Sequence, residues 1–508
     1  MKKNKHPLIT GTLLLTAAGL ASRIIGFFYK IFLVSLIGAE GIGIYQMVFP
    51  TYMLCVSLAS SGIQTAVSRF TAENFSTGQP RKAQRLFLTG LSIALGISVI
   101  LSFLLFSLAE PLAVYLLKEE RCLSLLRLMA LSIPFEVLHT CANGYFLGQQ
   151  KTGFPALSQL LEQSVRVLTT LLLYQIMLQN HISPAPELAA AGMLTAEMAA
   201  ALAAVTVLAF QKTPGSREVP TSENNRSYVR SLLKVALPVT SNRLLLNVLK
   251  SVEAAMIPLL LQKYYGDASM AFSVYGIFSG MAMPLIMLPS AITGSFSMML
   301  LPAISEAHAL KNDKKVAATI HSSLLLCFFL GITCTAAFLL FGPSLGQLLY
   351  GNDQVGSYLV TLAWICPLLY LTTVDSSILH GLGKTMSVFF HNLTGQLIRL
   401  LFSWFFIPYF GIRGCLWGVL ASQLTTAFLS TYTLKRSVSF PFNPGSLILF
   451  PCGCILAATG FLKLLQYFLS ILRETDQWIP FLLAAGIWGL TVLITCGWLG
   501  KKLKLLSS

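Results

Sequence analysis

The sequence predicts an all-α protein that crosses a membrane many times, and three observations predict it. Hydrophobic residues make up 55% of the 508 positions and charged residues only 11%, against about 25% charged residues in a typical soluble chain. Apolar segments long enough to cross about 30 Å of hydrocarbon recur along the whole chain. Short polar loops that carry Lys or Arg separate these segments. We therefore expect a polytopic membrane protein with little room for a soluble domain.

About 14 transmembrane helices are expected. Their predicted ranges are 8–37, 43–70, 86–109, 123–147, 156–179, 187–210, 229–262, 270–301, 317–341, 358–381, 387–408, 411–434, 443–470 and 480–500. Basic residues gather in every second loop, and the loops on the other side carry fewer of them, namely Lys118, Arg121, Lys263, Arg413 and Arg473. Because cytoplasmic loops are enriched in Lys and Arg, this asymmetry predicts that both termini lie in the cytoplasm.

The helices are expected to form two parallel repeats of six. GQQKTGFPALSQLLEQSVRVL (148–168) aligns without a gap with GLGKTMSVFFHNLTGQLIRLL (381–401), and SRIIGFFYK (22–30) aligns with NRLLLNVLK (242–250). Six is an even number, so both halves enter the membrane in the same direction. Two such bundles that face each other would enclose a cavity able to open to either side in turn.

The domain organisation follows from the repeat. We expect an N-terminal six-helix lobe at 1–210, a polar cytoplasmic linker at 211–228 and a C-terminal six-helix lobe at 229–436. Two extra transmembrane helices and a tail occupy 437–508.

Cations inside the repeated segments are the first candidates for a substrate-binding site. Arg23 and Lys30 are seven residues apart and share one helix face, and Arg243 and Lys250 repeat this spacing in the second half. A charge inside an apolar helix is costly, so we expect these four side chains to line the cavity and bind an anion. Glu253, one turn after Lys250, is expected to neutralise it when the site is empty. Two alternatives stay open: Arg23 could pair with a carboxylate, and Lys30 could reach the outer interface.

Further charged residues within the spans are candidates for the cavity or for ion coupling: Arg166, Arg399, Glu162, Asp375 and Glu136. Glu162 and Arg166 are four apart on one helix face, so a local ion pair is the simpler interpretation. Arg399 has Gly395 at the position equivalent to Glu162, and it therefore needs another partner, such as Asp375, or a ligand. Glu136, Glu197 and Asp375 could equally hold a proton or cation or pair with nearby polar groups.

No motif indicates catalysis, a metal or a cofactor. The histidines at 139, 321, 380 and 391 lack metal-ligand spacing such as HxxxH. Gly383-Lys384-Thr385 resembles the end of a phosphate loop, but position 378 is Ile where that motif needs Gly. The ten cysteines show no disulfide or zinc pattern. We expect a protein that is not an enzyme and needs no cofactor, with coupling to the membrane potential or to a monovalent ion.

SRIIGFFYKIFLVSLIGAEGIGIYQMVFP (22–50), followed by SGIQTAVSRFTAE (61–73), resembles a known family. It is similar to the polysaccharide-type members of the multidrug/oligosaccharidyl-lipid/polysaccharide (MOP) exporter superfamily, the group of stage V sporulation protein B and of the MurJ-type lipid II flippases. The family's functional arginine in its SR-x-x-G segment corresponds to Arg23, and the glycine to Gly26.

The resemblance implies a flippase of the bacterial cytoplasmic membrane. Its substrate would be an undecaprenyl-pyrophosphate-linked cell-wall precursor, with lipid II for spore cortex peptidoglycan as the first candidate. Cell-wall synthesis enzymes are further candidate partners, whereas the net charge of +16 reflects loop topology rather than nucleic-acid binding. Two alternatives remain: a cation-coupled multidrug antiporter of the same fold, and a membrane scaffold for cell-wall synthesis that transports nothing.

Overall fold

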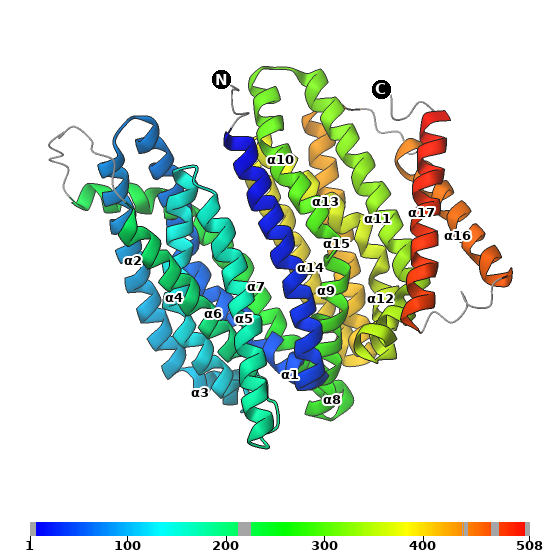
Figure 1. The fold of residues 1–508 in the computed structure, drawn as a ribbon, viewed down its shortest axis with the longest axis horizontal. Coiled ribbons are helices and arrows are strands. Elements are labelled where there is room, and N and C mark those ends of the chain that lie inside the picture. The colour runs from blue at the N-terminus through cyan, green and yellow to red at the C-terminus, as the bar shows by residue number, and fades with distance from the viewer. Residues whose placement is uncertain (1–6, 212–224, 439, 441–444, 469–476, 503–508) are drawn as a thin grey trace. The chain divides into compact units, whose positions relative to one another are not determined.

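The structure, a computed structural model, describes residues 7–211, 225–438, 440, 445–468 and 477–502. All regular structure in these ranges is helical (Figure 1). Eleven helices in this part of the chain are long and apolar enough to cross a membrane, with the long first helix counted once. The predicted all-α polytopic fold is confirmed. The count of 14 spans and the cytoplasmic termini stay predictions.

Contacts divide the chain into two compact units, Met1–Gly276 and Ile277–Ser508. In the first unit the helices are α1 (Pro7–Ser76), α2 (Pro80–Ser107), α3 (Ala109–Pro111), a π-helical turn (Leu112–Leu117), α4 (Cys122–Gly148), α5 (Gly153–Gln179), α6 (Glu187–Phe210), α7 (Asn225–Tyr265) and α8 (Ala268–Gly276). Most of the predicted linker, 212–224, lies outside the described residues. The predicted lobe boundaries stay a prediction.

The second unit begins with a π-helical turn (Ile277–Ala282), α9 (Met283–Met287) and α10 (Ser290–Ala309). It continues with α11 (Asp313–Tyr350), α12 (Asp353–Leu362), a 3₁₀ turn (Ala363–Ile365), α13 (Cys366–Gly381), α14 (Thr385–Phe410), α15 (Ile412–Ser437), a π-helical turn (Gly445–Leu449), α16 (Phe450–Phe468) and α17 (Trp478–Lys502). The predicted span 270–301 is broken around Pro284 and Pro289, because proline removes a backbone donor and its ring clashes with the preceding turn.

Gly38 divides α1 into two arms. Its backbone is in the left-handed region (φ 69°), which a side chain would strain, so the helix bends there. The first arm (7–37) and the second arm (39–76) correspond to two separate predicted spans, 8–37 and 43–70.

Polar contacts of Glu40 hold the bend in place. Its carboxylate accepts hydrogen bonds from Arg121 Nη1 (2.7 Å) and from Ser269 Oγ (2.8 Å), which connects α1 to the starts of α4 and α8. Arg121 Nε also donates to Glu119 (2.6 Å). The bonds to Glu119 and Glu40 raise the pKa of the Arg121 guanidinium, so that this group stays positively charged.

The second arm of α1 packs unusually close to α7. A Cβ added at Gly62 would lie 2.2 Å from both the Ala236 carbonyl oxygen and Thr240 Oγ1. Membrane helices approach this closely only where one of them presents a small residue, since apolar lipid gives little hydrophobic force between helices. The α1–α7 contact therefore depends on Gly62.

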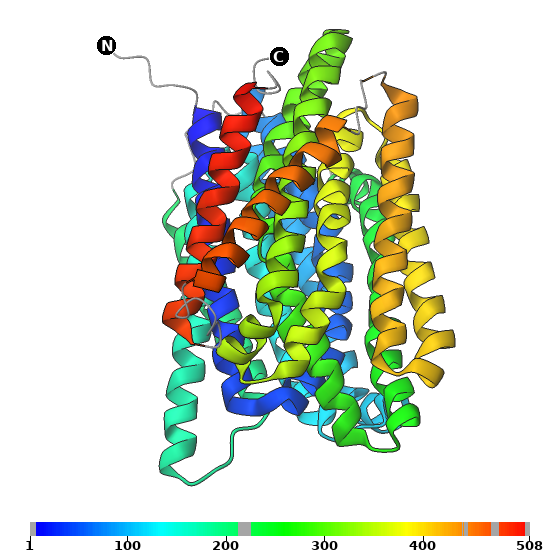
Figure 2. The same cartoon turned by 90° about the vertical axis from the view of Figure 1, so that its right-hand side faces the viewer.

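The last two helices form a pair that packs on α11 within the second unit (Figure 2). Phe341 of α11 makes edge-to-face contacts with Phe481 (5.8 Å between ring centroids) and Trp488 (6.0 Å) of α17. Such pairs add to the stabilisation that burial of the rings provides. Aromatic packing thus joins α17 to the bundle.

Replacing Gly62 by Val should force α1 and α7 apart, and we expect the free energy of unfolding to fall by about 1–3 kcal/mol or more. The melting temperature of the detergent-purified protein measures this. Gly96→Val on α2 is the matched control, because a Cβ there has no neighbour within 4 Å. Equal melting temperatures for the two variants would contradict the close packing described here.

Candidate functional site

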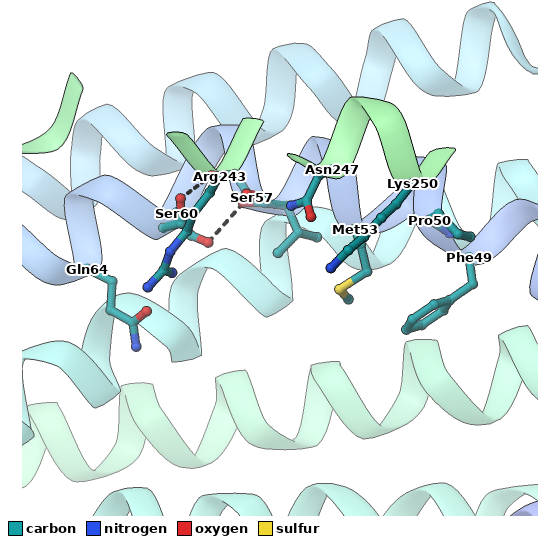
Figure 3. A pocket seen from close by; sticks show the side chains of 11 residues that line it. Phe49, Pro50, Met53, Ser57, Ser60, Gln64, Arg243, Asn247 and Lys250 are labelled. Carbon is teal, nitrogen blue, oxygen red and sulfur yellow. Dashed lines mark hydrogen bonds between the residues drawn. The ribbon is translucent and has the colours of Figure 1, made fainter. Parts of the chain in front are cut away.

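A pocket of about 440 Å³ lies between the second arm of α1 and α7, inside the first unit (Figure 3). From α1 it is lined by Phe49, Pro50, Met53, Val56, Ser57, Ser60, Ser61 and Gln64, and from α7 by Arg243, Asn247 and Lys250. The pocket thus combines apolar walls near one end with hydroxyls, amides and two cations.

Helix periodicity aligns the polar side chains of the pocket along one face of α7 and one face of α1. Arg243, Asn247 and Lys250 follow each other at intervals of four and three residues, so they share one face of α7. Figure 3 shows their side chains projecting from α7 to the same side. On α1, the hydroxyls of Ser60 and Ser61 donate back to the carbonyls of Val56 (2.8 Å) and Ser57 (2.7 Å). The oxygens of these hydroxyls keep their acceptor capacity.

The pocket is electropositive. Arg243 and Lys250 are exposed, and the lining residues include no acidic side chain. Ser57 Oγ is buried and makes no hydrogen bond to any of the described residues. An anion with several oxygens could accept from Arg243 in a paired geometry and from Lys250 as a point charge.

Only part of the predicted cation set lies in this pocket. Arg23, exposed, and Lys30, half-buried, lie on the first arm of α1 and are not among the lining residues. Glu253 is buried, one turn beyond Lys250, and does not line the pocket either. Contribution of these three side chains to substrate binding stays a prediction.

Charged groups of the first unit gather at a second place, which we call the buried charge cluster: Glu136, His139, Glu162, Arg166 and Glu197. Arg166 Nη2 lies 2.6 Å from Glu162 Oε1, so the expected local ion pair is present. The same nitrogen lies 3.2 Å from Glu197 Oε1 on α6. Glu197 Oε2 in turn lies 3.2 Å from His139 Nδ1 on α4.

Sequence reasoning missed the connection between these groups. Glu197 and His139 lie on separate helices, and the sequence does not show which faces of α4, α5 and α6 pack together. One signal was present: Glu136 and His139 are three apart, a spacing that puts both side chains on one face of α4.

Asp375 and Arg399 belong to the second unit. Asp375 of α13 is fully buried and accepts a hydrogen bond from Thr431 Oγ1 of α15 (2.8 Å). Arg399 lies half-buried on α14. Their predicted part in a cavity or in coupling stays a prediction.

The sequence model of the family described as "Polysaccharide biosynthesis protein" matches residues 8–308, more than half of the chain. The chain belongs to the polysaccharide biosynthesis protein family. Among its relatives, it is 28% identical to stage V sporulation protein B of Bacillus subtilis (strain 168) over 440 residues, which cover 85% of this chain and 84% of that protein. It is 24% identical to the lipid II flippase MurJ of the same organism over 503 residues, covering 93% and 89%.

Solved structures show the fold of this member of the polysaccharide biosynthesis protein family. The lipid II flippase MurJ in an inward closed conformation superposes with a TM-score of 0.73 at 14% identity, covering 97% of this chain and 99% of that one. An inward-facing multidrug resistance MATE family transporter of the MOP superfamily gives 0.66 at 16% identity, covering 84% and 98%. The expected MOP fold is confirmed.

Arg166→Ala should strongly destabilise the protein. It leaves Glu162 and Glu197 without their shared counter-charge, and removing one partner of a buried ion pair costs about 3–5 kcal/mol. The melting temperature of the purified protein should fall by several degrees. Arg127→Ala is the control, since that guanidinium is exposed on α4, over the Phe106 ring. A melting temperature equal to that of Arg127→Ala would mean that Arg166 does not stabilise the cluster.

Proposed function

We propose that this chain is a flippase that moves an undecaprenyl-pyrophosphate-linked cell-wall precursor across the bacterial cytoplasmic membrane by alternating access. Lipid II for spore cortex peptidoglycan is the substrate we propose first. Both termini lie in the cytoplasm in this proposal, as the loop charges predict.

The electropositive pocket is the observation that carries the proposal. Arg243 and Lys250 supply two cations, and the residues that line the pocket include no carboxylate. A pyrophosphate offers several anionic oxygens, which arginine binds through paired hydrogen bonds. Phe49, Pro50 and Met53 supply apolar surface beside these charges, as an isoprenoid chain attached to the pyrophosphate requires.

The relatives support the same substrate class. One is named a lipid II flippase and another a stage V sporulation protein. Relatives with these names favour transport over a purely structural role in the membrane, and they favour a lipid-linked cell-wall precursor over other anions.

Further residues complete the proposal. Arg23 and Lys30 would bind the substrate at another stage of transport, and Glu253 would neutralise Lys250 when no substrate is bound. Arg166, Arg399, Glu162, Asp375 and Glu136 remain candidates for the cavity or for coupling. The energy source would be the membrane potential or a monovalent ion. Cell-wall synthesis enzymes would deliver or receive the lipid.

A cation-coupled multidrug antiporter is the second candidate. The observation that favours it is the buried charge cluster, whose carboxylates Glu136, Glu162 and Glu197 could exchange a cation. Its substrates would be organic cations, which the positive charges of the pocket repel. Resistance to cationic dyes on expression, abolished by Glu197→Gln, would favour this function over the first.

Arg243→Ala and Lys250→Ala should each slow flipping at least tenfold in proteoliposomes that contain a polyprenyl-pyrophosphate disaccharide-peptide, because each removes a charge-assisted hydrogen bond of about 1.5–3 kcal/mol. Exposure of the lipid to a membrane-impermeant reagent gives the rate. Arg243→Lys should restore part of it, since charge is kept but the paired geometry is lost.

Lys263→Ala is the control on the same helix, exposed and outside the pocket. It should flip at the wild-type rate. Wild-type protein that exposes no lipid above protein-free vesicles would refute the function. Wild-type rates for both pocket variants, together with a loss in Arg23→Ala, would move the binding site to the first arm of α1.

A further inference from the structure

Three side chains of the buried charge cluster, which do not line the pocket, meet at one point: Glu136 and His139 of α4 and Glu197 of α6. One ligand atom from each lies within 4.8 Å of the other two. We propose that they bind a divalent transition-metal ion of the Zn²⁺ class. The site is independent of the pocket, so this inference does not rest on the proposed function.

The arrangement follows from helix packing. Glu136 and His139 are three residues apart, so α4 presents both to the same neighbour. A Glu-x-x-His pair on one helix, completed by a Glu from a facing helix, is a known way for a helical bundle to hold a metal in its core. Here α6 packs against α4 and supplies Glu197.

Burial and geometry favour a ligand between these groups. Glu197 is 1% exposed and His139 5% exposed. His139 Nδ1 and Glu197 Oε2 lie 3.2 Å apart, yet neither atom makes a hydrogen bond within the described part of the chain. Two ligands about 2.0–2.1 Å from a tetrahedral ion lie roughly 3.3 Å apart. The separation thus matches one edge of such a coordination shell.

The second oxygen of each carboxylate ligand, Glu197 Oε1 and Glu136 Oε1, already has a protein partner. Arg166 Nη2 approaches Glu197 Oε1 at 3.2 Å, which leaves Oε2 directed at His139. Thr140 Oγ1 donates to Glu136 Oε1 (3.2 Å). Such outer contacts orient metal ligands and limit their rotation. These contacts hold the ligand atoms within 4.8 Å of one another, and a small movement of the carboxylates would bring them to an ion.

Charge balance points the same way. The cluster holds three carboxylates, Glu136, Glu162 and Glu197, against the guanidinium of Arg166. A cation bound between Glu136 and Glu197 would add positive charge beside these carboxylates. Carboxylate charge inside a membrane protein is costly, and a bound cation lowers that cost. An imidazole among the ligands suits Zn²⁺ better than Mg²⁺ or Ca²⁺, which prefer oxygen ligands alone.

Metal content tests the inference directly. Full-length protein in detergent is stripped with a chelator, equilibrated with Zn²⁺, desalted and analysed by elemental mass spectrometry. We expect about one Zn²⁺ per chain and a higher melting temperature with Zn²⁺ than with chelator. His139→Asn and Glu136→Gln should each weaken Zn²⁺ binding at least tenfold. Glu136 is only half-buried, so its variant is the one that keeps the packing.

His391→Asn is the matched control. His391 is also a buried imidazole, but it lies in the second unit, where Nε2 contacts Thr433 Oγ1 at 3.1 Å. The His391→Asn variant should bind Zn²⁺ as tightly as the wild type does. The inference is overturned if the wild type retains no Zn²⁺, or if His139→Asn and Glu136→Gln bind it as tightly as His391→Asn. If the wild type binds Zn²⁺ but does not flip the lipid in proteoliposomes, the proposed function is wrong and the metal site stands.

Discussion

Inside a bilayer, a polar group has no water to bind, and this constraint governs the whole structure. Backbone amides must pair within their own segment, so the described regular structure is entirely helical. Charged side chains must find a counter-charge, a polar pocket or the interface. The first unit meets this requirement in two ways. Arg243 and Lys250 are exposed in a polar pocket, and Arg166 pairs with Glu162 and Glu197 in the buried charge cluster.

The second arm of α1 separates these two places. Phe49 and Met53 line the pocket, whereas Tyr52 is fully buried, and the same arm packs closely on α4 at Gly144 and Gly148. One helix therefore lines the pocket on one face and packs with another against α4, the helix that carries Glu136 and His139. Pro50, between Phe49 and Met53, weakens the helix where both faces are in use.

The bend at Gly38 and the close approach at Gly62 decide where that arm lies. Gly38 turns the chain, Glu40 fixes the turn through Arg121 and Ser269, and Gly62 lets α7 come close enough for Arg243 and Lys250 to share a pocket with serines of α1. Without these backbone features, Arg243 and Lys250 of α7 would not lie beside the serines of α1.

Local patterns were readable from the sequence alone. Hydropathy determined the membrane-spanning class. Helix periodicity determined that Arg243 and Lys250 share a face and that Glu162 can pair with Arg166. Each of these two results depends only on residues within two turns of one helix. Contacts between distant segments depended on tertiary packing: the pairing of Arg166 with Glu197, the meeting of Glu136 and His139 with Glu197, and the inclusion of Arg243 but not Arg23 in the pocket. Which helix faces which is set by close packing at small residues and by buried polar contacts, and no periodicity within one helix encodes it.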